Sequence, residues 1–245
     1  MNGSSRSIAI KKNIIASLFL KGISILVSLQ VVPLTINYIN PTRYGIWLTL
    51  SSIVAWLSYF DLGFAHGFRN RFAEAVAKGD MQLAREYVST TYVVLSLLFS
   101  SVFLIAIVVN HFVDWSAILN VDAAYSSELN IVFGILAFFF CLNIVASIFT
   151  TMLTANQKSA LASLIQTLGQ VFGFICIYIL TKTVPGNLDV LAFAFSGVPC
   201  FLLIIISIGM FLSGRYRHLS PSFHVVHFSL TKKIVGLGGQ FFIIM

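Results

Sequence analysis

The chain has 245 residues, of which 58% are apolar and 9% are charged, and its mean hydropathy is +0.94. A water-soluble domain carries about 25% charged residues, so this sequence lacks the charge that a soluble surface needs. Its 23 phenylalanines exclude intrinsic disorder as well. The composition therefore indicates a polytopic membrane protein built from helices.

Six segments are long enough to cross a bilayer, whose hydrocarbon core takes about 20 apolar helical residues. They are residues 14–39, 44–62, 87–109, 129–154, 160–181 and 188–212. Continuous apolar runs such as residues 102–109 favour helices over the alternating strands of a membrane barrel. We expect an all-α bundle in which residues 1–12 form a tail and residues 13–212 form one lobe of six transmembrane helices.

A seventh apolar segment follows a predicted loop at residues 213–233. It occupies residues 234–245, which would give about 18 Å of helix, too little to cross a membrane. We therefore expect this segment to be a truncated seventh helix, and the chain to be the front part of a longer protein.

Basic residues lie almost entirely on one side of this predicted topology. That side carries Arg6, Lys11, Lys12, Arg69, Arg71, Lys78, Arg85, Lys158, Arg215, Arg217, Lys232 and Lys233. The opposite side has only Arg43 and Lys182. Because cytoplasmic loops are enriched in Lys and Arg, the N-terminus is predicted to be cytoplasmic. The net charge of +7 is then explained by topology, and no nucleic-acid partner is expected.

The first segment has a polar face that includes a lysine. Ser17, Lys21, Ser24, Ser28 and Thr35 are spaced by three, four or seven residues, which places them on one side of a helix. Lys21 would lie about 15 Å into the membrane, a depth at which a charge usually has a function. Lys21 is expected to face an anionic substrate in a water-filled cavity. The alternative is a lysine that extends back to the headgroups.

Two more segments carry polar side chains along one face. On the fourth segment these are Asn143, Ser147, Thr150 and Thr154, and on the fifth they are Ser159, Ser163, Gln166, Gln170 and Thr181. Hydroxyl and amide groups hydrogen-bond sugars in a wet cavity, and they also join neighbouring membrane helices. Three polar faces together favour an internal cavity.

Asp61 ends the second segment. Three interpretations are open for its carboxylate: an ion pair with Lys21, an ion pair with Arg69, or no partner. A structural ion pair at the membrane boundary is the favoured interpretation, whereas a lone carboxyl could bind a proton and couple transport to a proton gradient.

Residues 64–82 are predicted to form an amphipathic segment at the cytoplasmic interface. Its apolar positions, spaced by four, are Phe64, Phe68, Phe72 and Val76. Arg69, Asn70 and Arg71 occupy other faces. The arginines suit phosphate groups, either those of ordinary lipids or the diphosphate of a lipid-linked substrate.

No residue pattern indicates an enzyme, a cofactor or a metal site. Cys141, Cys176 and Cys200 lie in apolar runs without metal-ligand spacing. His218, His224 and His227 are best explained as loop residues, and the sequence has no hydrolase or nucleotide-binding motif.

Several stretches resemble bacterial polysaccharide (O-antigen) flippases, a branch of the multidrug/oligosaccharidyl-lipid/polysaccharide exporter superfamily. The resemblance is carried by YGIWLTL at 44–50, YFDLG at 59–63, GFRN at 67–70, AEA at 73–75, AKGD at 77–80 and AREYVST at 84–90. GLGGQFFI at 236–243 is similar to the start of that family's seventh helix.

The resemblance implies a MATE-like lobe in the bacterial inner membrane that works by alternating access. The implied substrate is an undecaprenyl-diphosphate-linked oligosaccharide, used for O-antigen or other surface polysaccharide, and the pathway's polymerase or assembly proteins are further partners. Lys21 would attract the diphosphate or acidic sugars, and Ser24, Ser28, Asn143, Gln166 and Gln170 would contact sugar. Arg69, Asn70 and Arg71 would gather the headgroup at the cytoplasmic entrance, which Asp61 would order.

Three alternatives stay open at this point. A cation-coupled multidrug exporter of the same superfamily would be expected to carry acidic residues in its cavity. A membrane glycosyltransferase or polymerase would need carboxylates such as Asp114 and Asp122 in the longest outward loop. A non-transporting assembly subunit would suit a chain of this length.

Overall fold

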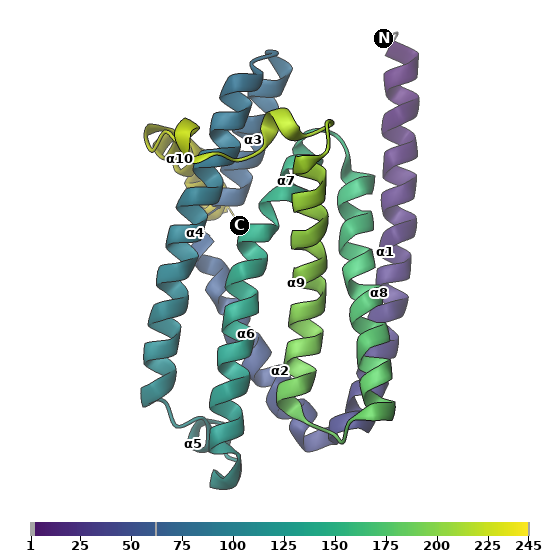
Figure 1. The fold of residues 1–245 in the computed structure, drawn as a ribbon, viewed down its shortest axis with the longest axis vertical. Helices are drawn as coiled ribbons and strands as arrows, with labels where there is room; N and C mark the ends of the chain where they lie inside the picture. The colour runs from purple at the N-terminus through teal and green to yellow at the C-terminus, as the bar shows by residue number, and fades with distance from the viewer. Residues whose placement is uncertain (1–2, 62, 245) are drawn as a thin grey trace.

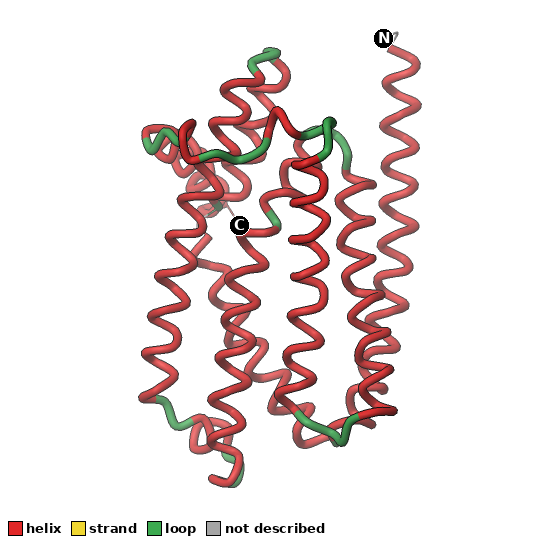
Figure 2. Tube along the Cα trace, viewed as in Figure 1, coloured by secondary structure: helices red, strands yellow, loops and turns green. Residues whose placement is uncertain are grey.

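The computed structural model describes residues 3–61 and 63–244, and the side-chain surroundings of residues 12–59 and 63–236. These residues form helices joined by short connections, with no strand among them (Figure 2). The all-helical fold class is confirmed over this part of the chain.

The long helices lie side by side along the longest axis of the molecule (Figure 1). The α-helices are α1 (Gly3–Ile39), α2 (Pro41–Ala55), α3 (Phe64–Ala77), α4 (Met81–Phe112), α5 (Trp115–Leu119), α6 (Ser126–Ala146), α7 (Ile148–Ala155), α8 (Ser159–Thr183), α9 (Leu188–Leu212) and α10 (Ser229–Ile244). The 3-10 helices are η1 (Trp56–Asp61), η2 (Ala123–Tyr125), η3 (Arg217–Leu219) and η4 (Phe223–Val225).

Five helical stretches in the described part are long and apolar enough to cross a membrane. They are Lys12–Ile39, Met81–Phe112, Ala123–Ala155, Ser159–Thr183 and Leu188–Leu212. They correspond to the first, third, fourth, fifth and sixth predicted segments, so the chain has the shape of a multi-pass membrane protein.

The predicted second span, residues 44–62, is not one straight helix. Helix α2 has 15 residues, about 22 Å of helix, which is too short to cross alone. The chain then tightens into η1, and α3 continues at a bend of 49°. A sixth span exists only if this bent pair crosses as one unit.

Polar residues at the helix starts explain several boundaries. The side chain of Asn40 accepts a hydrogen bond from the Arg43 backbone N–H, and Pro41 fits the first helical position of α2. Asp80 caps α4 in the same way through the Leu83 N–H. The predicted 64–82 segment therefore divides, because α3 ends at Ala77 and α4 begins at Met81.

The connections divide the bundle into two ends. The start of α1 and the α3–α4, α7–α8 and α9–α10 connections lie at one end (Figure 1), here called the basic end. It carries Lys78, Arg85, Lys158, Arg215 and Arg217. The opposite end holds the α1–α2 turn, the α4–α6 connection and the α8–α9 turn. The charge segregation expected from the sequence is thus also a segregation in space.

Helix α3 does not expose its apolar face to lipid, which corrects the prediction for residues 64–82. Phe64, Phe68 and Phe72 are buried in a core cluster shared with α4, α7 and α10. The spacing of these residues was seen correctly, but protein covers them. Helix α10 begins at Ser229, five residues earlier than predicted, and it packs its buried Ile234 against α3.

We predict that Gly67→Ala destabilises the protein by about 1–3 kcal/mol, the usual cost of overpacking a core. A Cβ atom at Gly67 would overlap the Ile234 carbonyl oxygen of α10. The matched control is Gly209→Ala, because a Cβ atom there meets nothing within 4 Å. The measurement is the free energy of unfolding in mixed micelles, and equal values for the two variants would contradict the close α3–α10 contact.

Candidate functional site

The polar faces of α1 and α8 pack against each other. Ser17 donates a hydrogen bond to the Ser159 hydroxyl at 3.3 Å, and Ser24 donates one to the Gln170 side-chain oxygen. Thr167 of α8 donates to the Leu20 carbonyl oxygen at 3.3 Å. Part of the two predicted polar faces therefore joins helices, as membrane helices commonly do.

Lys21 and Gln166 lie at the same level of this helix pair without joining in these contacts. The hydrogen bonds between α1 and the segment around α8 link residues 142 to 147 positions apart, and Gln166 lies 145 positions after Lys21. Both side chains are exposed, and neither has a hydrogen bond or ion pair within the described residues. Two polar groups thus remain available beside the α1–α8 contact.

Gln166 lies on an exposed side of α8. Its neighbours Ile165 and Thr167, about 100° to either side, are buried, whereas Gln166 and Gln170 are exposed. The open side of α8 therefore lies between its packed faces. Lys21 precedes Ser28 by seven residues, about two helical turns, so both lie on one side of α1.

A cavity of about 340 Å³ lies between α1, α2, α8 and α9. Ser28 and Gln170 line it together with apolar and aromatic residues of all four helices. No Asp, Glu, Lys or Arg stands among the described residues that line it. Two predicted sugar-contacting residues, Ser28 and Gln170, are thereby brought together, and Ser24 is bonded to Gln170 beside them.

Asn143 belongs to a second cavity of about 300 Å³ between α2, α6 and α9. Ser51 and Ser196 also line it, and the buried Ser51 hydroxyl has no partner in the described structure. Pro199 of α9 borders both cavities. The cavity that Asn143 lines is thus a neighbour of the cavity that Ser28 and Gln170 line. Sequence periodicity had no signal that could place Ser51 or Ser196 here.

The predicted entrance residues lie apart from Lys21. Helix α3 stands at the basic end, with α7, α8 and α9 between it and α1 in Figure 1. Arg69 and Asn70 are exposed, whereas Arg71 donates to Glu74 at 3.0 Å and to the Lys233 carbonyl oxygen at 3.4 Å. The side chain of Asp61 lies outside the described residues. Arg71 therefore ties α3 to α10 in addition to facing the basic end.

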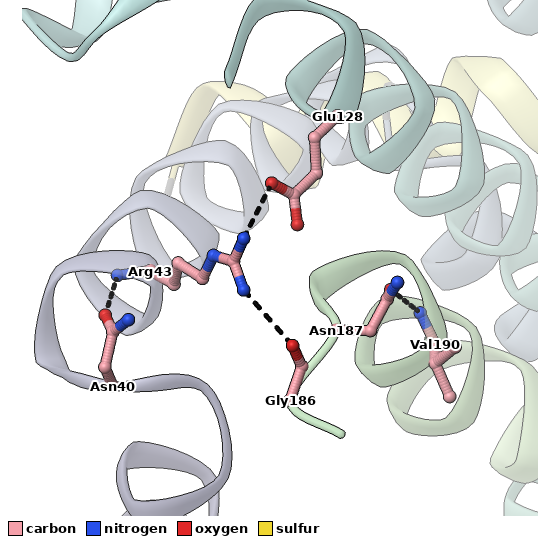
Figure 3. Close-up of polar contacts among 6 residues, drawn as sticks. All are labelled: Asn40, Arg43, Glu128, Gly186, Asn187 and Val190. Carbon is pink, nitrogen blue, oxygen red and sulfur yellow. Dashed lines mark hydrogen bonds and ion pairs between the residues drawn. The ribbon is translucent and has the colours of Figure 1, made fainter. Parts of the chain in front are cut away.

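Arg43 forms a contact at the opposite end that the sequence analysis missed. Its guanidinium lies 3.4 Å from the Glu128 carboxylate and donates to the Gly186 carbonyl oxygen at 3.1 Å (Figure 3). It also lies over the Tyr125 ring, 5.6 Å from the ring centre. One side chain thus joins the starts of α2 and α6 to the α8–α9 turn. An isolated arginine in an otherwise acidic set of loops was the available signal.

Asp114 and Asp122, in the α4–α6 connection, act as helix caps. Asp114 accepts hydrogen bonds from Ser116 and from the Ala117 N–H, and the Ser116 hydroxyl is the main reason that the pKa of Asp114 is lowered. Asp122 accepts one from the Ala124 N–H. Within the described residues no group of three His, Cys, Asp or Glu side chains is arranged to hold a metal ion.

No family model, curated protein or solved structure matches this chain. A function for this chain is therefore inferred from its residues and their geometry.

We predict that Arg43→Gln lowers the free energy of unfolding by about 2 kcal/mol, because hydrogen bonds to charged groups are worth about 1.5–3 kcal/mol and Glu128 would lose its partner. Both side chains are more than two-thirds buried, with exposed fractions of 27% and 20%. Lys182→Gln is the matched control, since Lys182 is an exposed cation at the same end. Equal stability of the two variants would contradict the linking role of Arg43.

Proposed function

We propose that this chain is one lobe of a bacterial inner-membrane transporter that flips a lipid-linked oligosaccharide by alternating access. The observation that carries the proposal is the pair of Lys21 and Gln166, which lie exposed at one level on the neighbouring helices α1 and α8. A cation and an amide beside a cavity provide partners for a phosphate group and for sugar hydroxyls.

The charge of Lys21 favours an anionic cargo. The described residues that line the adjoining cavity include no carboxylate, and Lys21 lies well inside the α1 span, which begins at Lys12. A cation-coupled drug exporter would instead need acidic groups at this depth. Glu128, in the first turn of α6, already forms an ion pair with Arg43, far from Lys21 at the opposite end of the bundle.

Contact with the polar part of the substrate, its diphosphate or its sugars, is assigned to five polar groups on α1, α6 and α8. These are Ser24, Ser28, Asn143, Gln166 and Gln170. Of these, Gln166 has no described partner, so its amide is free to exchange water for sugar hydroxyls.

The basic end is assigned to the cytoplasm by the positive-inside rule. The exposed side chains of Arg69 and Asn70 would then meet headgroups there, and Asp61 and Arg71 would support this entrance. Helix α3 lies apart from α1, so the substrate would meet the entrance residues first and Lys21 later on its path. Partners are membrane lipids and the polymerase or assembly proteins of the same pathway.

A glycosyltransferase or polymerase is less well supported. Its catalytic carboxylates would have to be Asp114 and Asp122, and both accept backbone hydrogen bonds at helix starts. Capping explains these residues without a reaction.

We predict that Lys21→Glu reduces export of the lipid-linked oligosaccharide roughly tenfold or more, because repulsion of an anionic headgroup replaces attraction and each 1.4 kcal/mol is a factor of ten. Lys21→Arg is expected to keep most of the export. The readout is surface glycan, together with lipid-linked precursor retained in the cytoplasmic leaflet, in cells whose export depends on this protein.

Lys182→Glu is the matched charge reversal at the opposite end, where the side chain is exposed. It is expected to leave export unchanged. Wild-type export by Lys21→Glu, at wild-type protein level, would refute the role of Lys21.

A further inference from the structure

We propose that the cavity between α1, α2, α8 and α9 binds one hydrocarbon chain of an isoprenoid lipid phosphate, with the anionic headgroup toward Lys21. The identity of the lipid rests on the proposed function. The existence of a site for a single chain rests on the size, the lining and the polarity of the cavity.

The size of the cavity suits one chain. An apolar cavity of about 150 Å³ holds a benzene molecule, so about 340 Å³ has room for roughly a dozen carbon atoms. An isoprenoid phosphate carries one chain and can place one end of it here. A phospholipid carries two chains, and the cavity has no room for both.

The wall of the cavity is aromatic and aliphatic. The ring centres of Trp47 and Phe195 lie 4.6 Å apart in an edge-on arrangement, and those of Trp47 and Tyr44 lie 5.8 Å apart. Phe174 and Ile177 of α8 form the facing wall. Ligand pockets in proteins are typically apolar and aromatic with a few polar groups that fix orientation, and this cavity follows that pattern.

Polarity changes along the cavity. The two polar side chains, Ser28 and Gln170, lie toward the basic end of α1 and α8, next to Val27, whereas Val31, Val32 and Ile177 follow toward the opposite end. Lys21 lies a further two turns, about 10 Å, beyond Ser28 on the same side of α1. An amphiphile would therefore enter with its headgroup toward Lys21 and its chain toward Tyr44.

The cavity is open to the surroundings. The side chains of Val32, Leu48 and Phe195 line it and keep exposed fractions of 41%, 44% and 38%. The membrane surrounds these helices, so a chain can enter from the lipid without unfolding the bundle.

The test uses photolabelling of the whole chain in phospholipid nanodiscs with a diazirine-bearing farnesyl diphosphate. We expect labelling of residues 27–32 and 44–48 that is saturable and is displaced by unlabelled farnesyl diphosphate. Inorganic diphosphate alone should not displace the label, because the chain provides the main contact. Equal labelling of these residues by a diazirine phospholipid would show that bulk lipid fills the cavity, and would overturn the proposal.

Filling the cavity provides the matched variants. Val32→Phe is expected to weaken labelling at least tenfold, whereas Leu29→Phe, on the exposed lipid-facing side of the same helix, should leave it unchanged. Leu48→Trp fills the cavity from α2 and is the second variant if Val32→Phe does not fold. Wild-type labelling in the folded cavity-filling variants would overturn the site.

Headgroup orientation is tested separately. Lys21→Gln should weaken displacement by farnesyl diphosphate about tenfold and leave displacement by uncharged farnesol unchanged. Equal effects on both ligands would overturn the assigned orientation.

If labelling follows these expectations but glycan export does not depend on the chain, the proposed function fails while the lipid site stands. If export continues in a folded Val32→Phe variant that does not bind, the lipid site is unnecessary and the function stands.

Discussion

The hydrocarbon interior of a bilayer offers no hydrogen-bond partners, and this constraint shapes the structure. Each polar group in a spanning helix must find a partner in the protein or lie along a water-accessible groove. Ser17, Ser24 and Thr167 satisfy the constraint by bonding across α1 and α8. Lys21 and Gln166 remain exposed beside them. The capture of the anionic group is therefore assigned to Lys21, a polar residue that helix packing does not use.

The two ends of α2 are held in different ways. At its start, Arg43 links three helix connections through Glu128 and Gly186. At its end, the helix tightens into η1 and the chain bends by 49° before α3. Tyr44 and Trp47, which line the cavity, lie directly after the fixed end.

Apolar segment length was enough to predict the helices from α4 to α9 within about six residues at each end, because lipid-facing and core-facing residues are both apolar. At residues 44–62 it gave no sign that the helix tightens into η1 or that the chain bends before α3. It also assigned Phe64, Phe68 and Phe72 to the membrane surface. A stripe of phenylalanines looks the same whether lipid or another helix covers it, and only the packing of α4, α7 and α10 distinguishes the two.

The polar faces could be predicted as faces but not divided by role. Spacing placed Ser24, Lys21 and Ser28 together, yet it gave no sign that Ser24 would bond to Gln170 while Lys21 stayed without a partner. That outcome depends on which side of α1 meets α8, a long-range contact. The Arg43–Glu128 pair joins residues 85 positions apart and was missed for the same reason.

The central claim is that water reaches Lys21 and Gln166 through a groove, and cysteine accessibility tests it most directly. Cys141, Cys176 and Cys200 are first replaced by alanine, and a single cysteine is placed at residue 21, 166 or 19. The account predicts that a charged, membrane-impermeant thiol reagent labels Lys21→Cys and Gln166→Cys but not Phe19→Cys, which is exposed on the opposite side of α1. Absence of labelling at residues 21 and 166, or labelling equal to that at residue 19, would contradict it.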